Sequence, residues 1–531
     1  MKILNVIIIV LISSFISFAQ NENESQSIEL PEFVITGIRK VEIPIIKKKK
    51  PELISGLSEE FFMPSFSSEE FNPTGFSSPF ITSAEVNKIK SQFNSLLRAE
   101  LGTVTLPMGE FYYNNSLSDV LINFGFIGRS EREFVNKAGY NYVTASIGAK
   151  YFVDHTAEVL PGLGITFNAR YLLDSYNLYG SQNPSFTRET DNAQIGISLF
   201  NKFTAIKYGL NLTTDLKKFR ENNLSENLLN TSAFLRLPVN GINFRADGQI
   251  KHQSMQNNLS GIGSYNYYSL SVKAKLKLLK PIEITGGLFY SAQGDNKFFS
   301  PQAAVTMKFT DKVFLTGEFS PSTTFLSRKD LTSMNRFYKL NATDNIYLKE
   351  KYKTKAALAY KYLKYFQVSV GGSYARIDNL PYFVYQLGPG DFTLATLNRV
   401  DKTKLFLNLL FFQGPSGELF GAANYQSVLD ANGNQVPYYP KFSIDINYSY
   451  PITQTLNAKA KLNYSSGIFT DLANKNRLNN YFNLSIYLNY KLLKNLVVTF
   501  SAENLLNRKN FLFENYRAKT IDVYGGFEYR W

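Results

Sequence analysis

Apolar and polar residues alternate along most of this chain. From about residue 95 to the end, the sequence is a series of segments in which every second residue is apolar. A period of two predicts β-strands with one apolar face and one wet face. The segments run about nine to twelve residues, long enough to cross a bilayer at a tilt, whereas strands of soluble proteins usually have about five or six. The clearest segments are 163–171, 270–278, 442–450, 456–464 and 482–490.

The polar faces of these segments help to distinguish the wall of a transmembrane barrel from a sheet of a soluble protein. In a barrel that spans a membrane, the apolar face contacts lipid and the polar face lines a hydrated lumen. A closed barrel also satisfies every backbone hydrogen bond, which lipid cannot do. We therefore predict an all-β fold, a transmembrane antiparallel β-barrel of about 20–22 strands, in which an even number brings both termini to the periplasmic side.

Five lysines alternate with apolar residues in two of these segments, so they are predicted to face the lumen. Together they could bias a pore toward anions. Acidic residues such as Asp247 and Asp445 could instead balance their charge locally, and the sequence leaves both interpretations open. The lysines are Lys273, Lys275, Lys277, Lys459 and Lys461.

The connections between segments also alternate, between short turns and long loops. Short turns are expected near 201–203, 238–241, 310–312 and 493–495, and long loops at 175–191, 321–345, 379–402 and 426–441. Short periplasmic turns and long external loops are typical of outer-membrane barrels. This asymmetry predicts which end of the barrel faces the outside.

The chain divides into three parts. Residues 1–19 have the layout of a secretory signal peptide, with Lys2 before an apolar run and Ser17-Phe18-Ala19 as the cleavage site. Residues 20–90 are rich in Ser, Pro, Glu and Lys without sustained alternation, which predicts an irregular periplasmic extension with a reduced or absent plug. Residues 91–531 form the predicted barrel, and the expected location is the outer membrane of a Gram-negative bacterium.

Composition excludes several kinds of chemistry. The chain has no Cys and two His, which removes disulfides, thiolate metal sites and a three-histidine zinc site. We therefore expect no cofactor and no metal site. The formal net charge is +14, but the lysines lie at alternating strand positions and form no basic patch, so a nucleic-acid partner is not expected.

His252-Gln253-Ser254 is the candidate for catalysis. His252 and Ser254 continue the predicted lipid face of the segment that ends at Ile250, and the pair resembles the arrangement in outer-membrane phospholipase, where a base activates the nucleophile. The alternative, which we favour, is a strand that emerges from the bilayer into a polar loop. We therefore predict no catalytic residue and no enzyme activity, and we expect His155 to be solvated in a connection.

Residues 430–434 resemble the start of a calcium-binding loop. The Gly is misplaced for that motif, and Lys441 stands where a bidentate Glu should be. Turn chemistry explains Asn432-Gly433 instead.

The C-terminal strand ends on an aromatic residue. Aromatic and apolar residues share one face of this strand, and they resemble the signal by which outer-membrane barrels are recognised for insertion. The expected partners are therefore outer-membrane lipid and the barrel-assembly machinery. The residues of this face are Val523, Phe527, Tyr529 and Trp531.

Four stretches resemble TonB-dependent outer-membrane receptors. Residues 96–110 are similar to a first barrel segment of a plug-poor group from Bacteroidetes-like bacteria, and 502–511 and 525–531 are similar to the end of a receptor barrel. A short apolar segment in the extension resembles a TonB box, which would add as a strand to the sheet edge of TonB. The segment consists of Leu30, Pro31, Glu32, Phe33, Val34, Ile35, Thr36 and Gly37.

The resemblance implies a 22-stranded barrel that takes up an unknown small ligand with energy from TonB. A full receptor carries a folded plug between box and barrel, whereas only residues 38–93 intervene here. The first hypothesis is therefore a receptor-like transporter, with TonB coupling left open. The second is a passive porin-like or partner-filled barrel, and the third is an outer-membrane hydrolase that uses His252 and Ser254.

Overall fold

The computed structural model describes residues 94–531 without positions 118, 155, 159, 202–204, 221–222, 258–259, 280, 342–344, 363–364, 387–391 and 414–416. The predicted signal peptide, the extension with its TonB-box-like segment, and His155 lie outside the described residues.

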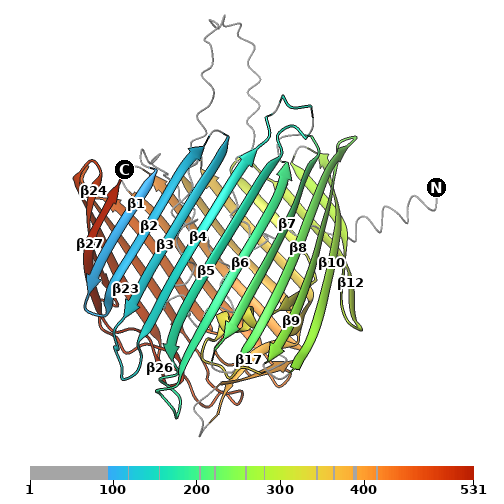
Figure 1. Cartoon of the computed structure of the whole chain (residues 1–531). Coiled ribbons are helices and arrows are strands. Elements are labelled where there is room, and N and C mark those ends of the chain that lie inside the picture. The colour runs from blue at the N-terminus through green and yellow to red at the C-terminus, as the bar shows by residue number, and fades with distance from the viewer. Residues whose placement is uncertain are drawn as a thin grey trace, which may run out of the picture.

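Long antiparallel strands form the wall of the molecule (Figure 1). The wall strands are β1 (Ser95–Gly102), β2 (Thr105–Leu117), β3 (Val120–Glu131), β4 (Tyr140–Phe152), β5 (Gly164–Asn177), β6 (Thr187–Asn201), β7 (Lys207–Phe219), β8 (Leu224–Val239), β9 (Ile242–Asn257), β10 (Ser260–Leu279), β11 (Ile282–Gln293), β12 (Asn296–Lys308), β13 (Val313–Phe319), β14 (Ser322–Leu326), β15 (Ile346–Tyr362), β16 (Phe366–Asp378), β19 (Val400–Gln413), β20 (Gly417–Leu429), β21 (Phe442–Pro451), β22 (Leu456–Ser466), β23 (Tyr481–Leu493), β24 (Leu496–Glu503) and β27 (Asp522–Arg530).

The sheet closes on itself. β1 pairs with β2 on one side and with β27 on the other, so the first and last strands complete the ring. β13 and β14 both pair with β15 and together make one wall strand, which gives a barrel of 22 strands. The predicted all-β transmembrane barrel with an even number of strands is confirmed.

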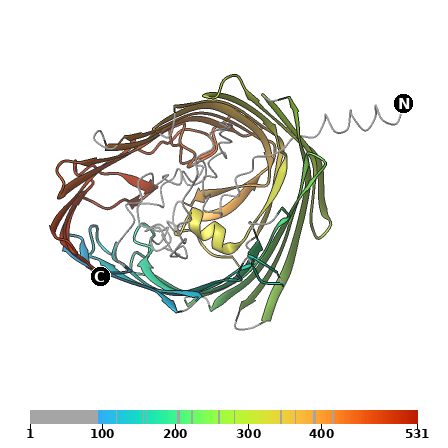
Figure 2. The ribbon, with the colours of Figure 1, turned by 90° about the horizontal axis from the view of Figure 1, so that it is seen from above.

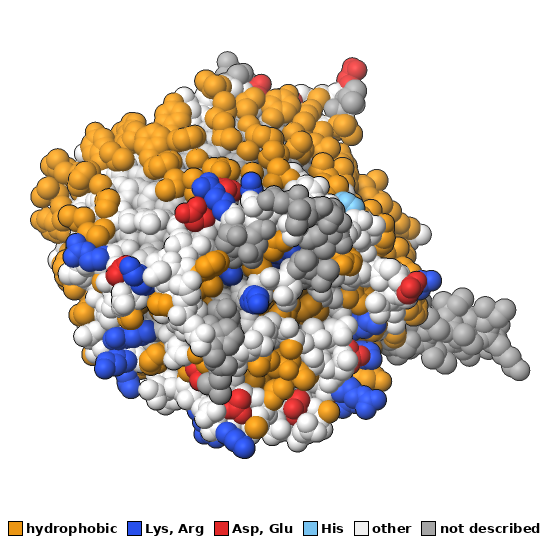
Figure 3. Space-filling model, turned by 60° about the horizontal axis from the view of Figure 1, so that its bottom comes forward, with side chains coloured by type: hydrophobic (Ala, Val, Ile, Leu, Met, Phe, Trp, Pro, Cys, Tyr) orange, Lys and Arg blue, Asp and Glu red, His pale blue; other side chains and the backbone are white. Residues whose placement is uncertain are grey.

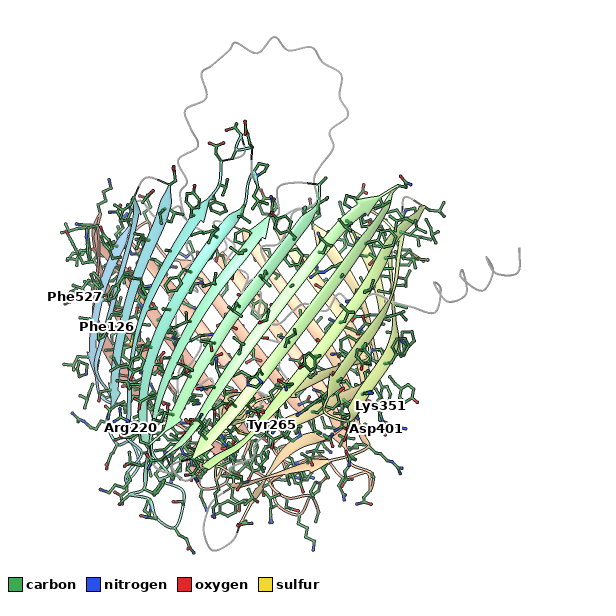
Figure 4. All side chains as sticks on the ribbon, turned by 45° about the vertical axis from the view of Figure 1, so that its right-hand side comes forward. Phe126, Arg220, Tyr265, Lys351, Asp401 and Phe527 are labelled. Atoms are coloured by element: carbon green, nitrogen blue, oxygen red, sulfur yellow. The ribbon has the colours of Figure 1, made fainter. Side chains whose placement is uncertain are left out.

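The alternation of the sequence becomes the two faces of this wall. On β10, Leu270, Val272 and Leu278 are exposed on the outer surface, and Tyr267 is buried on the opposite face. Hydrophobic side chains cover the outer wall, whereas charged side chains are scattered over one end of the barrel (Figure 3). Figure 4 shows Phe126 and Phe527 at mid-height on the wall, and Arg220 and Asp401 near that end.

The two ends of the barrel differ. The backbone N–H of Asn94 donates to Trp531 at 2.9 Å, so both termini of the barrel lie at one end, the upper end in Figure 1. This is the short-turn end. β8 and β9 are joined there by Asn240 and Gly241, which both have positive φ as a two-residue hairpin turn requires.

The opposite end, the long-loop end, carries the remaining elements. They are α3 (Arg328–Met334), the hairpin of β17 (Leu380–Tyr385) and β18 (Phe392–Leu397), and the hairpin of β25 (Phe511–Phe513) and β26 (Tyr516–Arg517). Among the described residues, no helix is both long and apolar enough to cross a membrane. The expected loop 175–191 is shorter than predicted, because β5 and β6 continue their pairing up to Asn177 and Thr187.

Candidate functional site at the closed mouth of the barrel

The loops of the long-loop end fold into the mouth of the barrel. Seen along the barrel axis, α3 and the loop hairpins lie inside the ring of wall strands (Figure 2). We call the described residues of segments 178–186, 327–345, 380–397, 430–441 and 504–521 the loop cap. Any ligand that approaches from the long-loop end meets the loop cap first, so the loop cap and the lumen beneath it form the candidate site.

The loop cap has an aromatic core of its own. Phe337 stacks on Tyr516 with ring centroids 3.8 Å apart, and Tyr179 meets Tyr516 edge-on at 5.1 Å. Phe392 and Tyr438 pack against Phe513 at 5.4 Å and 5.1 Å. Such pairs contribute about 0.5–1.5 kcal/mol each beyond the area they bury. Five loops that are distant in sequence therefore share one packed interior.

Burial in this core affects its phenols. It raises the pKa of the Tyr179 and Tyr438 hydroxyls above the usual value of a tyrosine. Burial also raises the pKa of Tyr439. All three hydroxyls therefore remain neutral at physiological pH.

Two arginines join the loop cap to the wall. The Arg336 guanidinium lies 3.6 Å from the ring centroid of Tyr176 and 4.6 Å from that of Tyr140, both on wall strands. Arg188 Nη1 donates to the backbone carbonyls of Arg336 at 2.7 Å and Tyr338 at 2.9 Å. A cation held against aromatic faces is most stabilising when it is desolvated, as Arg336 is.

The start of α3 is fastened to strands β7 and β8. The Glu226 carboxylate accepts from the backbone N–H groups of Arg328 at 2.9 Å and Lys329 at 3.0 Å. Lys329 Nζ lies 2.7 Å from the Asp215 carboxylate, and Lys217 Nζ donates to Thr332 at 2.9 Å. Four polar contacts thus fix a seven-residue helix that would be unstable alone.

A buried lysine fastens the last loop of the loop cap. Lys519 Nζ lies 2.5 Å from Glu503 and 3.1 Å from Asp522, and its side chain is 2% exposed. Asn504 has φ of 46°, and its side-chain amide donates to the Lys519 carbonyl at 3.0 Å. Asn tolerates this left-handed backbone better than most residues, which explains the Asn at this position of the receptor-like motif.

The barrel seam carries the predicted C-terminal residues. Val523, Phe527, Tyr529 and Trp531 follow the outward face of β27, and Tyr529 stacks on Trp531 at 5.7 Å. On the inward face, Arg98 forms ion pairs with Glu528 and, at 3.2 Å, with Glu110. The seam therefore carries aromatic rings on its outer face and ion pairs on its inner face.

The predicted lumen lysines lie opposite the outward leucines. Lys275 Nζ is 2.5 Å from Glu283, and Lys277 Nζ is 3.7 Å from the same carboxylate. Glu283 lies on the neighbouring strand β11, and the segment that holds the lysines does not reveal which residues face it across the sheet. Lys273, Lys459 and Lys461 occupy the same inward face of β10 and β22.

The other sequence candidates are also placed. His252 and Ser254 lie on the outward face of β9, beyond Ile250. The Asp430 carboxylate accepts from the backbone N–H groups of Asn432 at 2.9 Å and Asn434 at 2.8 Å, so it caps a turn. Within the described part of the chain, no cluster of three or more His, Cys, Asp or Glu could hold a metal ion.

The loop cap was not predicted from the sequence. Its apolar residues stand in irregular segments without a period, so they looked like ordinary loop residues. One local signal was available: Ser327 and Asp330 form a capping box that starts α3. The pairing of its aromatic residues across distant loops has no such signal.

Known proteins share the fold. No family model matches the sequence, and no curated protein matches it. The structure is similar to the ferric-catecholate import receptor Fiu of E. coli K12, with a TM-score of 0.62 and 10% identity over 83% of this chain and 82% of that chain. It is also similar to the siderophore receptor PiuA of Acinetobacter baumannii, with a TM-score of 0.61 and 12% identity over 82% and 81% of the two chains. A third similar structure is that of a double mutant of the ferric enterobactin receptor PfeA of Pseudomonas aeruginosa. Its TM-score is 0.61, with 11% identity over 82% of this chain and 80% of that chain.

Proposed function

We propose that this protein is an outer-membrane receptor-like transporter that takes up a small ligand through a gated lumen. The observation that carries the proposal is the loop cap, because a barrel of 22 strands without a filling would be a wide channel. A packed aromatic core across the mouth suits a route that opens for a ligand better than it suits a permanent pore. The fold shared with ferric-siderophore receptors supports the same conclusion.

Export and assembly belong to this proposal. Residues 1–19 direct secretion, and the aromatic face of β27 is read by the barrel-assembly machinery during insertion into the outer membrane. Residues 30–37 act as the coupling strand for TonB, since an apolar, β-prone segment in an extension can add to a sheet edge. The protein needs no cofactor for this role.

The second candidate is a passive barrel that a partner fills. It is favoured by the short distance between residues 30–37 and β1, which leaves residues 38–94 where a receptor has its plug. In this case residues 30–37 would be dispensable for passage of the ligand.

Conductance of the purified mature chain in a planar bilayer tests the proposal. We expect small or no steady current, because the loop cap closes the mouth. A large, steady conductance from a correctly folded barrel would contradict a gated receptor and favour the passive pore.

Uptake measurements separate the two candidates. Cells that carry a deletion of residues 30–37 should lose energy-dependent accumulation of the ligand pool that the wild type takes up from a labelled nutrient mixture. A deletion of equal length within residues 52–59 is the matched control. Unchanged uptake in the first deletion would exclude TonB coupling through this segment.

A further inference from the structure

A histidine on the outer face of the barrel is oriented by a neighbour on the next strand. His252 Nδ1 lies 2.7 Å from Asn266 Oδ1, and the two residues face each other across β9 and β10. An amide oxygen can only accept, so Nδ1 carries the proton of this contact. Nε2 is therefore left with a free lone pair and can act as a base.

A serine follows on the same side of the same strand. Ser254 is two residues beyond His252, a spacing of about 6.7 Å along a strand, which imidazole and hydroxyl side chains can bridge. Asn227 on β8 stands directly opposite Ser254, so its side chain points to the same face. Four polar side chains therefore lie on neighbouring positions of the outer surface. They are the hydroxyl of Ser254, the imidazole of His252 with its proton on Nδ1, and the amides of Asn266 and Asn227.

An apolar groove begins beside these polar groups. It has a volume of about 320 Å³ and extends over the outward faces of β8 to β11, with Gly248, Ile250, Tyr268, Leu270 and Tyr290 among its lining residues. Gly248 forms its floor, since the space above this residue is open. The strand order along β9 is Gly248, Ile250, His252 and Ser254, so the groove lies toward the middle of the membrane and the polar groups toward the long-loop end.

The sequence alone favoured no catalytic residue here, but the contact between His252 and Asn266 changes that expectation. We propose that Ser254, His252 and Asn266 form a serine hydrolase site for long-chain carboxylic esters of membrane lipids. Ser254 and His252 are the catalytic residues, Asn266 is a positioning residue, and the groove over Gly248 receives the acyl chain. The aromatic rings of Tyr268 and Tyr290 form part of the lining of this groove. This activity is separate from the proposed transport through the lumen, because the site is on the outside of the wall.

The reaction balances without a metal or redox partner. Ser254 Oγ attacks the ester carbonyl carbon while His252 Nε2 takes the hydroxyl proton. The C–O bond to the lipid alcohol breaks, and His252 returns the proton to the leaving oxygen. Water then attacks the acyl-serine with the same base, which releases a fatty acid and restores Ser254. In this proposal the oxyanion that forms is stabilised by the side-chain amide of Asn227, the residue opposite Ser254 on β8.

Fatty-acid release by the full mature chain in phospholipid and detergent micelles tests the proposal, together with labelling by a long-chain fluorophosphonate and mapping of the label by mass spectrometry. We expect the wild type to release fatty acid and to carry the label on Ser254. Ser254→Ala and His252→Ala should each lower the rate by about a thousandfold or more. Ser264→Ala removes the hydroxyl on the other side of Ser254 and is the matched control with an unchanged rate.

Two variants separate a catalytic site from a structural cluster. Asn266→Ala should lower kcat with little change in KM, and Asn266→Asp should restore the rate and shift the acidic limb of the pH profile. Gly248→Leu fills the groove without a backbone clash, so it should raise KM for a long-chain ester and leave a short-chain ester unaffected. All variants are first checked as folded barrels by heat-modifiable gel migration.

The proposal is overturned if the folded wild type releases no fatty acid and takes no label at Ser254. It is also overturned if Ser254→Ala keeps the wild-type rate, since the activity would then come from elsewhere.

Discussion

Phe337 lies against Tyr516 with ring centroids 3.8 Å apart and ring planes inclined by 23°. Phe337 follows α3, whereas Tyr516 belongs to β26, close to the C-terminus. Their stacking joins two loops that leave the wall at different strands. The packing of the loop cap therefore depends on contacts between loops and not on any one loop.

Phe337→Ala should open the mouth. Removal of a buried Phe costs about 3–5 kcal/mol, and here the loss falls on the loop cap while the hydrogen-bonded wall remains. We expect higher single-channel conductance in planar bilayers than for the wild type. Phe126→Ala, which removes a ring from the outer wall, is the control and should leave the current unchanged. Equal currents from all three proteins would mean that the loop cap does not limit the channel.

The seam between β1 and β27 should depend strongly on Arg98. Its loss leaves the carboxylate of Glu528, whose side chain is 2% exposed, without its partner across the seam. Removing one member of a buried ion pair costs about 3–5 kcal/mol. Arg98→Ala should therefore lower the temperature at which the barrel unfolds in heat-modifiable gel migration.

Arg220→Ala is the matched control for the seam. Arg220 pairs with Asp191 and Glu189 on the outer surface near the long-loop end, where water screens the charges. This variant should unfold at the wild-type temperature. A similar loss in both variants would show that the seam is not the weak point of the barrel.

Lys519→Met should loosen the last loop of the loop cap. The substitution keeps the length of the side chain but leaves Glu503 and Asp522 without the cation between them. Exposed Arg508 and Lys509 in this loop are trypsin sites. Cleavage there should become faster on intact cells, and Lys353→Met, which removes a partly exposed pair with Glu350, should leave the rate unchanged. Cleavage only after the periplasm is opened would place the long-loop end inside the cell envelope and contradict the orientation proposed.

The wall could be predicted from sequence because its chemistry is local. An apolar outer face and a polar inner face force a period of two, so residues such as Leu270 and Val272 identify their strand without knowledge of any partner. The expected number of strands, 20–22, agrees with the barrel for the same reason. β13 and β14 form one interrupted wall strand. The residues between them show no pattern from which it could be predicted that the two segments belong to the same strand.

The candidate site could not be predicted in the same way. Phe513 and Tyr438 look like ordinary loop residues, since their partners are contributed by other loops. Glu283 and Asn266 are likewise ordinary polar strand residues until the register places them beside Lys275 and His252. Register across strands is set by the whole sheet, so the groups that one side chain meets are not readable from its own segment.

Trp531 should matter for assembly more than for stability. Its ring lies on the outer surface, stacked on Tyr529 and 6.1 Å from Phe111, so it contributes little to the interior of the barrel. Deletion of Trp531 should reduce the amount of barrel in outer-membrane fractions several-fold, whereas the barrel refolded in detergent should unfold at nearly the wild-type temperature. Trp531→Phe keeps a terminal aromatic ring and should restore the amount in cells. If the deletion lowers the unfolding temperature as much as it lowers the amount in cells, the residue acts through stability, and its role as an insertion signal is rejected.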